Sequence, residues 1–295
     1  MFRVRRLLAP FVLCIALLFS EAQAFTIAWL SDTQNYHNAY KPIFDGMTQW
    51  IADNREALDI RFVFHTGDVV GSWSSEDQWR QARESMGILS SASIPFLTVC
   101  GNHDIGYRMN YANFLKYVLS LRPASMSQEY GDTGSRYELF SANGRDYIFM
   151  GIAFSNRGPS EDEVNWINGV LRQYSSRDAI IITHSYLKKS ASYTTQGKAI
   201  FEKIVKANPN VFLVLCGHCR DISYKNVQLD DDGDGDPDRT VYAILSNFQG
   251  SKAGGGGYMR ILDFRDDDIY LYTYSPYYDS CEYPKGKTEA TVPLP

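Results

Sequence analysis

The sequence lacks several features that would place it in a particular class of protein. Only five of its 295 residues are cysteines, and a disulfide-stapled scaffold needs a denser set. Positive charge is not in excess, because the formal net charge is −5, whereas nucleic-acid-binding domains usually carry a basic face. No linker rich in proline, serine or glycine divides the chain, and no repeat is visible. We therefore expect one large domain without an evident nucleic-acid-binding surface.

Long apolar runs are absent after the first residues. Three arginines precede an apolar run from Leu7 to Phe19, which is followed by Ala22-Gln23-Ala24. This arrangement is typical of a secretory signal peptide. A retained anchor is the alternative, but the run has 13 residues where a membrane helix needs about 20. We expect residues 1–24 to be a signal peptide and residues 25–295 to be the exported domain, periplasmic or secreted, with no membrane span after cleavage.

Five short polar clusters each come directly after an apolar, β-rich run. They are Asp32-Thr33-Gln34, Gly67-Asp68, Gly101-Asn102-His103-Asp104, His184 and Gly217-His218. Neighbouring clusters are about one βαβ unit apart, with 36 residues from Asp32 to Asp68 and 34 from His184 to His218. Open α/β sheets bind ligands at the carboxyl ends of their strands. We therefore expect these clusters to meet in one site.

The side chains of these clusters are typical metal ligands. Four of the five histidines lie at or beside predicted strand ends, namely His65, His103, His184 and His218. A single histidine at such a place is usually structural. Here the histidines are interleaved with Asp32, Asp68 and Asn102, whose oxygen atoms can also coordinate a cation. The sequence therefore predicts a metal centre.

The remaining pattern predicts a mixed α/β architecture. Two strands flank Asn143-Gly144, which supplies the positive φ angles of a tight hairpin turn. An aromatic stripe from Tyr107 to Leu121 favours a helix. Past residue 220 the chain looks all-β, and we expect its strands to form a second sheet; they are predicted at 222–229, 240–245, 258–264 and 269–274. Two packed sheets flanked by helices are the expected arrangement.

The ordered series from Asp32 to His218 resembles the calcineurin-like metallophosphoesterases. Gly101-Asn102-His103-Asp104 is its most specific part, and the segment from Val241 to Gln249 is similar to a secreted bacterial branch. The resemblance implies an α/β fold with two packed mixed β-sheets flanked by helices, a four-layer αββα sandwich. It also implies hydrolysis of phosphate mono- or diesters by attack of a metal-bound hydroxide. The expected partner is a small phosphorylated substrate.

The resemblance implies metal ligands position by position. Asp68 would bridge two metals, and Asn102, His184 and His218 would complete the shell of the second. Asp32 would bind the first metal. The expected ions are one or two divalent or trivalent cations, manganese, iron or zinc.

Two positions of the first metal depart from the family pattern, which places histidine at Gln34 and at Arg220. Gln34 can still offer a carbonyl oxygen and would favour a harder ion. Arg220 stays protonated and has no lone pair to offer. We expect it to grip a phosphate oxygen of the substrate. His37 is a candidate replacement imidazole, although a surface histidine is the simpler interpretation.

His103 is the candidate acid for the leaving oxygen, and Asp104 is expected to orient its imidazole. One alternative is a catalytically weakened binding module that kept the fold, which the altered first-metal shell favours. Another is a thiol oxidoreductase that uses Cys216 and Cys219. The acidic run from Asp230 to Asp238 is either a solvated hairpin tip or a structural calcium loop, although an EF-hand count places Val241 where a glutamate belongs.

Overall fold

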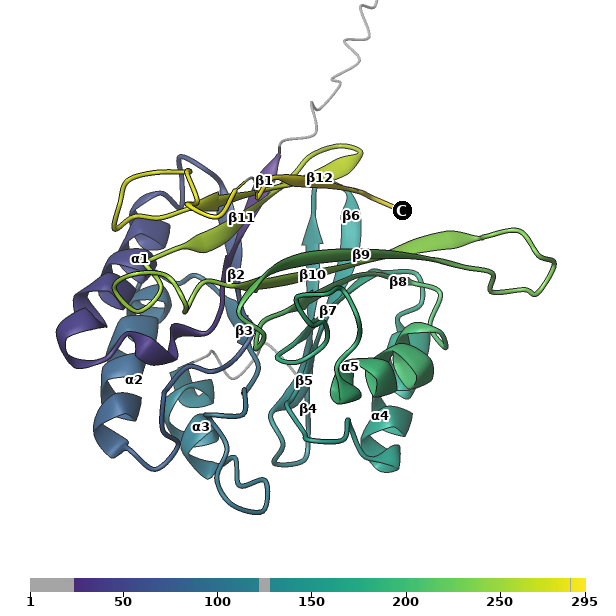
Figure 1. Ribbon diagram of the computed structural model, residues 1–295. Coiled ribbons are helices and arrows are strands. Elements are labelled where there is room, and N and C mark those ends of the chain that lie inside the picture. The colour runs from purple at the N-terminus through teal and green to yellow at the C-terminus, as the bar shows by residue number, and fades with distance from the viewer. Residues whose placement is uncertain (1–23, 122–127, 287) are drawn as a thin grey trace, which may run out of the picture.

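The structure of the protein is a computed structural model that describes residues 24–121, 128–286 and 288–295. The expected signal peptide, residues 1–24, lies outside the described residues apart from its last position. Two β-sheets pack face to face, and helices cover the outer face of each (Figure 1). This arrangement confirms the predicted α/β sandwich. None of the helices in the described ranges combines the length and apolar composition that a membrane span requires.

The first sheet has the strand order β13-β12-β11-β1-β2-β3. Its strands are β1 (Phe25–Leu30), β2 (Ile60–His65), β3 (Phe96–Thr98), β11 (Met259–Phe264), β12 (Asp268–Tyr274) and β13 (Ala290–Pro293). β1, β2 and β3 are parallel, while β11 pairs antiparallel with β1. The carboxyl ends of the three parallel strands therefore lie at the same edge of this sheet, where the first three polar clusters follow them.

The second sheet has the strand order β4-β5-β6-β7-β8-β10-β9. Its strands are β4 (Gln128–Tyr130), β5 (Ser135–Ala142), β6 (Arg145–Ile152), β7 (Asp178–Thr183), β8 (Val211–Cys216), β9 (Asp221–Leu229) and β10 (Arg239–Asn247). β6, β7, β8 and β10 are parallel to their neighbours in this series. Asn143 and Gly144 join β5 to β6 with φ angles of 53° and 74°, which confirms the predicted hairpin turn.

One topological expectation is wrong. The strands after residue 220 do not form a sheet of their own. β9 and β10 extend the second sheet beyond β8, whereas β11 and β12 extend the first sheet beyond β1. Alternation of apolar residues identifies a strand but not its neighbour, and each sheet had an edge whose backbone groups needed pairing. The C-terminal part of the chain therefore supports both sheets.

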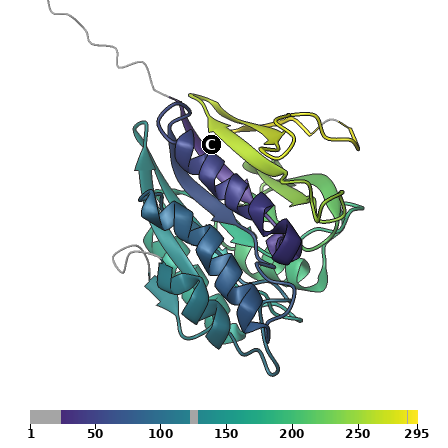
Figure 2. The same cartoon turned by 90° about the vertical axis from the view of Figure 1, so that its left-hand side faces the viewer.

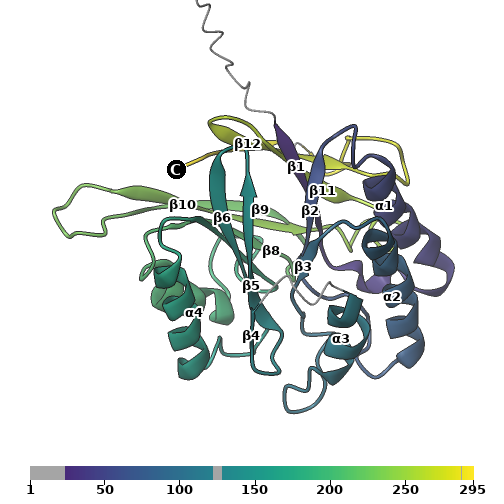
Figure 3. The same cartoon turned by 180° about the vertical axis from the view of Figure 1, so that it is seen from behind.

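Helices α1 (Lys41–Asp53), α2 (Glu76–Ser91) and α3 (Ala112–Tyr117) lie on the outer side of the first sheet. Figure 2 shows α1 and α2 running side by side across it. On the second sheet lie α4 (Glu161–Gln173) and α5 (Thr195–Ile200), and the latter continues as a π-helix, Phe201–Val205. Figure 3 shows α4 on the opposite side of the molecule from α1 to α3. The remaining helical turns are 3₁₀ segments at Thr33–Asn35, Asn38–Tyr40 and Leu119–Leu121.

The helix predicted from Tyr107 to Leu121 is shorter than expected. Arg108 and Met109 have φ angles of 58° and 59°, which an α-helix cannot contain. A bridge between Gly106 and Asn110 closes this turn instead. The helix can begin only at Ala112.

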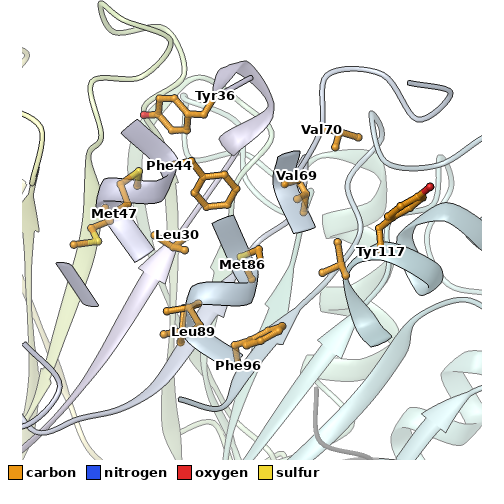
Figure 4. Close-up of a cluster of buried hydrophobic side chains, with 14 of the residues drawn as sticks. Leu30, Tyr36, Phe44, Met47, Val69, Val70, Met86, Leu89, Phe96 and Tyr117 are labelled. Carbon is orange, nitrogen blue, oxygen red and sulfur yellow. The ribbon is translucent and has the colours of Figure 1, made fainter. Parts of the chain in front are cut away.

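Alternating side chains of β1 connect two hydrophobic layers. Ile27 and Trp29 face the second sheet and belong to the cluster between the sheets. Leu30 points to the other side, where it joins Phe44 of α1 and Met86 of α2 (Figure 4). Burying one such side chain contributes roughly 1.5–3 kcal/mol. Because both faces of β1 are covered, its end is a rigid place for a polar site.

Candidate metal centre

Three candidate residues adopt a backbone conformation that is uncommon outside glycine. Asp32, Asp68 and His218 have φ angles of 50°, 53° and 68°, in the left-handed region. The surrounding backbone holds them there. The amide of His218 donates to both carboxylate oxygens of Asp32 at 3.2 Å, and the amide of Asp32 donates to the carbonyl of Gly67 at 3.1 Å. Strain of this kind clusters at functional sites.

Three predicted ligands converge on the imidazole of a fourth, His184. Its Nε2 atom lies 3.3 Å from Asp68 Oδ1, 3.1 Å from Asn102 Oδ1 and 3.2 Å from His218 Nδ1. On the other side of the ring, Nδ1 lies 2.8 Å from the carbonyl oxygen of Thr66. That contact makes Nδ1 the hydrogen-bond donor and turns the lone pair of Nε2 toward the cluster. The two strands that end at Asp68 and His184 belong to different sheets, so the cluster lies where the sheets meet.

Two glycines leave room for the carboxylates. A Cβ atom on Gly101 would lie 2.2 Å from Oδ1 of Asp68, and one on Gly217 would lie 2.3 Å from Oδ2 of Asp32. Any larger residue would therefore collide with a candidate ligand. The glycines of the Gly-Asn-His-Asp and Gly-His clusters thus have a defined steric role.

Asp32 is supported from behind by a chain of hydroxyl groups. The indole Nε1 of Trp29 donates to Thr66 Oγ1 at 3.1 Å, and the Thr66 hydroxyl donates to Ser31 Oγ at 2.8 Å. The Ser31 hydroxyl in turn donates to Oδ2 of Asp32. All four side chains are buried. The orientation of the carboxylate is therefore fixed by the fold.

The side chain of Gln34 has an unpaired oxygen atom that fits the role of a cation ligand. Its amide Nε2 donates to Oε1 of Gln249. Its own carbonyl oxygen, Oε1, is buried and has no hydrogen-bond partner within the described residues. Leaving a buried acceptor unpaired costs about 1–3 kcal/mol. A metal ion held by Gln34 and Asp32 would satisfy this oxygen, so these side chains fit a cation site.

Asn247 and Gln249 also belong to the site, although the sequence analysis did not assign them a role there. Asn247 Nδ2 donates to the carbonyl of His218 at 3.0 Å, and its Oδ1 accepts the amide of Gln249 at 2.9 Å. Both residues are buried and come at the end of β10. The rule that identified the other clusters would have found them, because they too follow an apolar strand.

The electric field in the cluster favours a positive charge. Burial alone would lower the pKa of His184, but the carboxylate of Asp68 outweighs it and raises that pKa to about 9. Burial raises the pKa of Asp32 to about 7, with His184 opposing the shift and Asp68 adding to it. Burial and His184 together lower the pKa of His218 to about 4. The same field would favour a metal cation, which would displace the proton from His184 Nε2 on binding.

The expected pairing of His103 with Asp104 is wrong. His103 is exposed, and its Nδ1 lies 2.9 Å from the carbonyl oxygen of Gly71, to which it donates. Asp104 is buried and accepts the amides of Val70 and Gly101 at 3.0 and 2.8 Å. Its two oxygens are thus occupied by backbone groups, and it anchors the loop instead of orienting the imidazole. The amide of His103 donates to Oδ1 of Asp68 at 2.9 Å, which keeps His103 beside the cluster.

The other polar side chains near the site have different roles. Arg220 is exposed, and its side chain makes no ion pair or hydrogen bond within the described part of the chain. His37 Nδ1 lies 3.1 Å from the backbone oxygen of Gln34, so the His37 imidazole contacts the backbone of Gln34. His65 is fully buried, accepts the amide of Gly67 at 3.1 Å and lies 3.0 Å from the Thr33 hydroxyl. His65 is therefore a structural histidine.

Two further sequence features lie outside this centre. Burial raises the pKa of Cys216 to about 12, and all cysteines in the described ranges are free, which argues against a thiol oxidoreductase. Asp230, Asp232 and Asp238 bring carboxylate oxygens within 4.8 Å of one another. They are exposed at the tip of the hairpin that projects between β9 and β10 (Figure 1). A calcium ion at this tip stays a prediction.

The family model for calcineurin-like phosphoesterases matches residues 25–219. The uncharacterized protein YvnB of Bacillus subtilis (strain 168) is 41% identical over 259 residues, which cover 86% of this chain and 20% of that protein. This chain thus spans about a fifth of the length of the curated relative it matches.

Two solved phosphatase structures have a similar fold. One is a dimetal phosphatase from Danio rerio, with a TM-score of 0.62 and 13% identity, covering 91% of this chain and 98% of that one. The other is the purple acid phosphatase PPD1 from yellow lupin, with a TM-score of 0.59 and 12% identity, covering 92% of this chain and 55% of that one. At these identities the likeness shows the fold alone.

Proposed function

The chain belongs to the calcineurin-like phosphoesterase family, and from this premise we propose that it is a metal-dependent hydrolase of phosphate mono- or diesters. The observation that carries the proposal is the convergence of Asp68, Asn102 and His218 on His184, whose Nε2 lies 3.1–3.3 Å from their ligand atoms. The substrate class is a small phosphorylated molecule.

Two neighbouring groups of side chains would hold the metal. Asp68, Asn102, His184 and His218 provide two oxygens and two nitrogens for one ion. Asp32 and the unpartnered oxygen of Gln34 provide an oxygen site for another, with Asp68 shared between them. Such ions supply Lewis-acid chemistry: they activate water and neutralise charge on phosphate oxygens. Mixed nitrogen and oxygen ligands suit manganese, iron or zinc.

Two residues outside the ligand set would act on the substrate. His103 donates from Nδ1 to the carbonyl of Gly71, so its Nε2 is left to carry a proton to the leaving oxygen. Arg220 is exposed and free of an acidic partner in the described residues. Its guanidinium would bind phosphate oxygens in a bidentate fork. Both groups lie outside the buried cluster, on the side that a substrate can reach.

We also propose that the protein is exported to the periplasm or secreted. The support is the basic, apolar and small-residue pattern of residues 1–24. The mass and N-terminal sequence of the protein recovered from the cell envelope and the medium test this. A chain that retains residues 1–24 in the cytoplasm contradicts it.

The proposed function is tested on residues 25–295 incubated with manganese, iron or zinc and freed of loosely held ions. We expect one or two ions per chain by elemental analysis and hydrolysis of p-nitrophenyl phosphate or its bis-ester. Asp68→Asn keeps the shape of the side chain and should lose both the metal and at least 100-fold in kcat/KM. Metal retention with wild-type turnover in Asp68→Asn contradicts the assignment.

Arg220→His distinguishes one bound ion from two. If Arg220 excludes a cation from the first-metal position by charge, histidine should raise the metal content toward two per chain. Unchanged occupancy contradicts that account of Arg220.

The alternative is a binding module with this fold. The altered first-metal shell favours it, because Gln34 and Arg220 replace two imidazoles. A protein that holds no metal and hydrolyses neither ester, while still binding phosphate, would support the binding module over the hydrolase.

A further inference from the structure

An aromatic hollow lies beside the candidate metal centre. It has a volume of about 710 Å³, within the usual range for small-molecule sites of about 300–1,000 Å³. Tyr258, Tyr278 and Tyr283 contribute aromatic walls, and the lining has two lysines against one acid: Lys252, Lys285 and Glu282. The loops that form it, residues 248–258 and 275–286, appear in yellow-green and yellow in Figure 2. No part of the proposed hydrolysis uses these residues.

Three consecutive residues connect the hollow to the metal centre. Asn247 binds the carbonyl of His218, and Gln249 binds the side chain of Gln34. Between them, Phe248 packs on Tyr258 and Tyr283, with ring centroids 5.7 and 5.1 Å away. The next residue, Gly250, lines the hollow. Consecutive Cα atoms are about 3.8 Å apart. Gly250, in the wall of the hollow, directly follows Gln249, which contacts the candidate ligand Gln34.

Arg220 also links the two sites. A Cβ atom on Gly250 would lie 3.6 Å from Cδ of Arg220, so the proposed phosphate-binding side chain touches the wall of the hollow. The following residue, Asp221, forms an ion pair with Lys189 at 2.6 Å. A substrate whose phosphate lies at Arg220 could therefore extend into the hollow.

The walls of the hollow are suited to a ring. Tyr258 and Tyr283 meet edge to face, with centroids 5.1 Å apart and an interplanar angle of 83°. Tyr278 lies over Tyr258 at 5.7 Å and is 44% exposed, so its ring is open to a ligand. The hydroxyl of Tyr283 is buried without a hydrogen-bond partner in the described residues. The wall thus combines aromatic faces, an unpaired polar atom and lysine side chains.

We propose that this hollow is the leaving-group subsite and that it binds a ring attached to the phosphate, either the base of a nucleotide or the ring of a sugar phosphate. The inference rests on the proposed phosphoesterase activity. Aromatic side chains stack on bases, and removing one such side chain lowers affinity by about 5- to 150-fold. The lysines complement the negative charge of the phosphorylated ligand.

Three substrates with the same type of leaving oxygen test the proposal: adenosine 5′-monophosphate, ribose 5-phosphate and glycerol 3-phosphate. Each releases a primary alcohol, so differences in kcat/KM report on the remainder of the leaving group. A nucleotide subsite predicts a preference for adenosine 5′-monophosphate over ribose 5-phosphate. A sugar subsite predicts that both exceed glycerol phosphate and that the base adds nothing. Equal kcat/KM for all three overturns the proposal.

Variants of Tyr278 test whether the preference for a ring substrate arises in the hollow. Tyr278→Ala should lower kcat/KM for the preferred ring substrate about 5- to 150-fold and leave glycerol phosphate unchanged. Tyr278→Phe keeps the ring and should retain the preference. Tyr40→Ala is the matched control, because Tyr40 is as exposed as Tyr278, at 45% against 44%, does not line the hollow and is not among the ring contacts of Tyr278. Equal losses in Tyr40→Ala and Tyr278→Ala place the effect elsewhere and overturn the subsite.

Calorimetric binding of the same three compounds separates this proposal from the hydrolase proposal. Binding that favours the ring compounds and depends on Tyr278, without any turnover, supports the hollow and contradicts the hydrolase. Turnover without a ring preference supports the hydrolase and contradicts the hollow.

Discussion

The two glycines that face Asp32 and Asp68 allow the metal centre to be perturbed one side at a time. In Gly101→Ala, the new Cβ would lie 2.2 Å from Asp68 Oδ1 and 2.4 Å from the backbone nitrogen of Asp68. The nitrogen cannot turn aside as a side chain can, so the loop itself must move. In Gly217→Ala, the nearest atoms are Asp32 Oδ2 at 2.3 Å and Ser31 Oγ at 2.5 Å, which belong to buried side chains. The two variants should therefore disturb different ligands.

The size of the effect follows from overpacking. Forcing an extra methyl group into a packed site costs about 1–3 kcal/mol. For a chain of this size each kcal/mol shifts Tm by roughly 2–4 °C, so Gly101→Ala should unfold about 2–12 °C lower. Displacement of Asp68, the proposed shared ligand, should also lower the content of both metals. Gly217→Ala should mainly lower the metal content at the first position, which Asp32 would form, because His184 and His218 would still hold the second metal.

The assay is metal content by elemental analysis together with thermal unfolding, with and without added manganese. Gly46→Ala in α1 is the matched control, because a Cβ there meets nothing within 4 Å. Alanine should stabilise that helix by about 0.5–1 kcal/mol and leave the metal unchanged. Full metal content and an unchanged Tm in Gly101→Ala would refute the steric role of this glycine. Equal metal loss in Gly101→Ala and Gly217→Ala would refute the division of ligands between two ions.

Two further predictions concern single side chains. His103→Ala should slow hydrolysis of alkyl phosphates, which have poor leaving groups, about 100-fold and affect p-nitrophenyl phosphate much less; equal losses in kcat for both would remove His103 from the role of acid. Because burial raises the pKa of Cys216 to about 12, roughly one molecule in 10,000 carries its thiolate at pH 8. Iodoacetamide should therefore label exposed Cys281 in the folded protein and Cys216 only after unfolding; labelling of Cys216 at the rate of Cys281, read by peptide mass spectrometry, would contradict its burial.

Much of the fold could be predicted because local patterns specified it. The apolar, β-rich run before Asp32 is β1, Phe25–Leu30. Ser75 and Ser160 each accept a backbone amide at the start of a helix, as serine favours at that position. The partners of β11 and β12 could not be predicted, because strand pairing is decided by contacts between distant segments. β11 pairs directly with β1, although the two strands lie near opposite ends of the chain.

The convergence of the candidate ligands could be predicted for a simpler reason. Asp32, Asp68 and Asn102 follow parallel strands of one sheet, and His184 and His218 follow parallel strands of the other. The strand-end rule therefore brings each group together, and the packing of the sheets brings the groups to each other. The rule does not specify hydrogen bonds. For that reason it paired His103 with Asp104, although Asp104 had nearer donors in its own loop.

The Gln34 and Gln249 pair gives the proposed first-metal position a chemistry of its own. The hydrogen bond between the two amides occupies the nitrogen end of Gln34 and so determines that the oxygen end is the one left unpaired. Together with Asp32, this would make an oxygen-only position beside a second position that has two imidazoles. Oxygen ligands select harder ions than imidazole does. We therefore infer that the two positions differ in metal preference and that the oxygen-only position takes the harder ion.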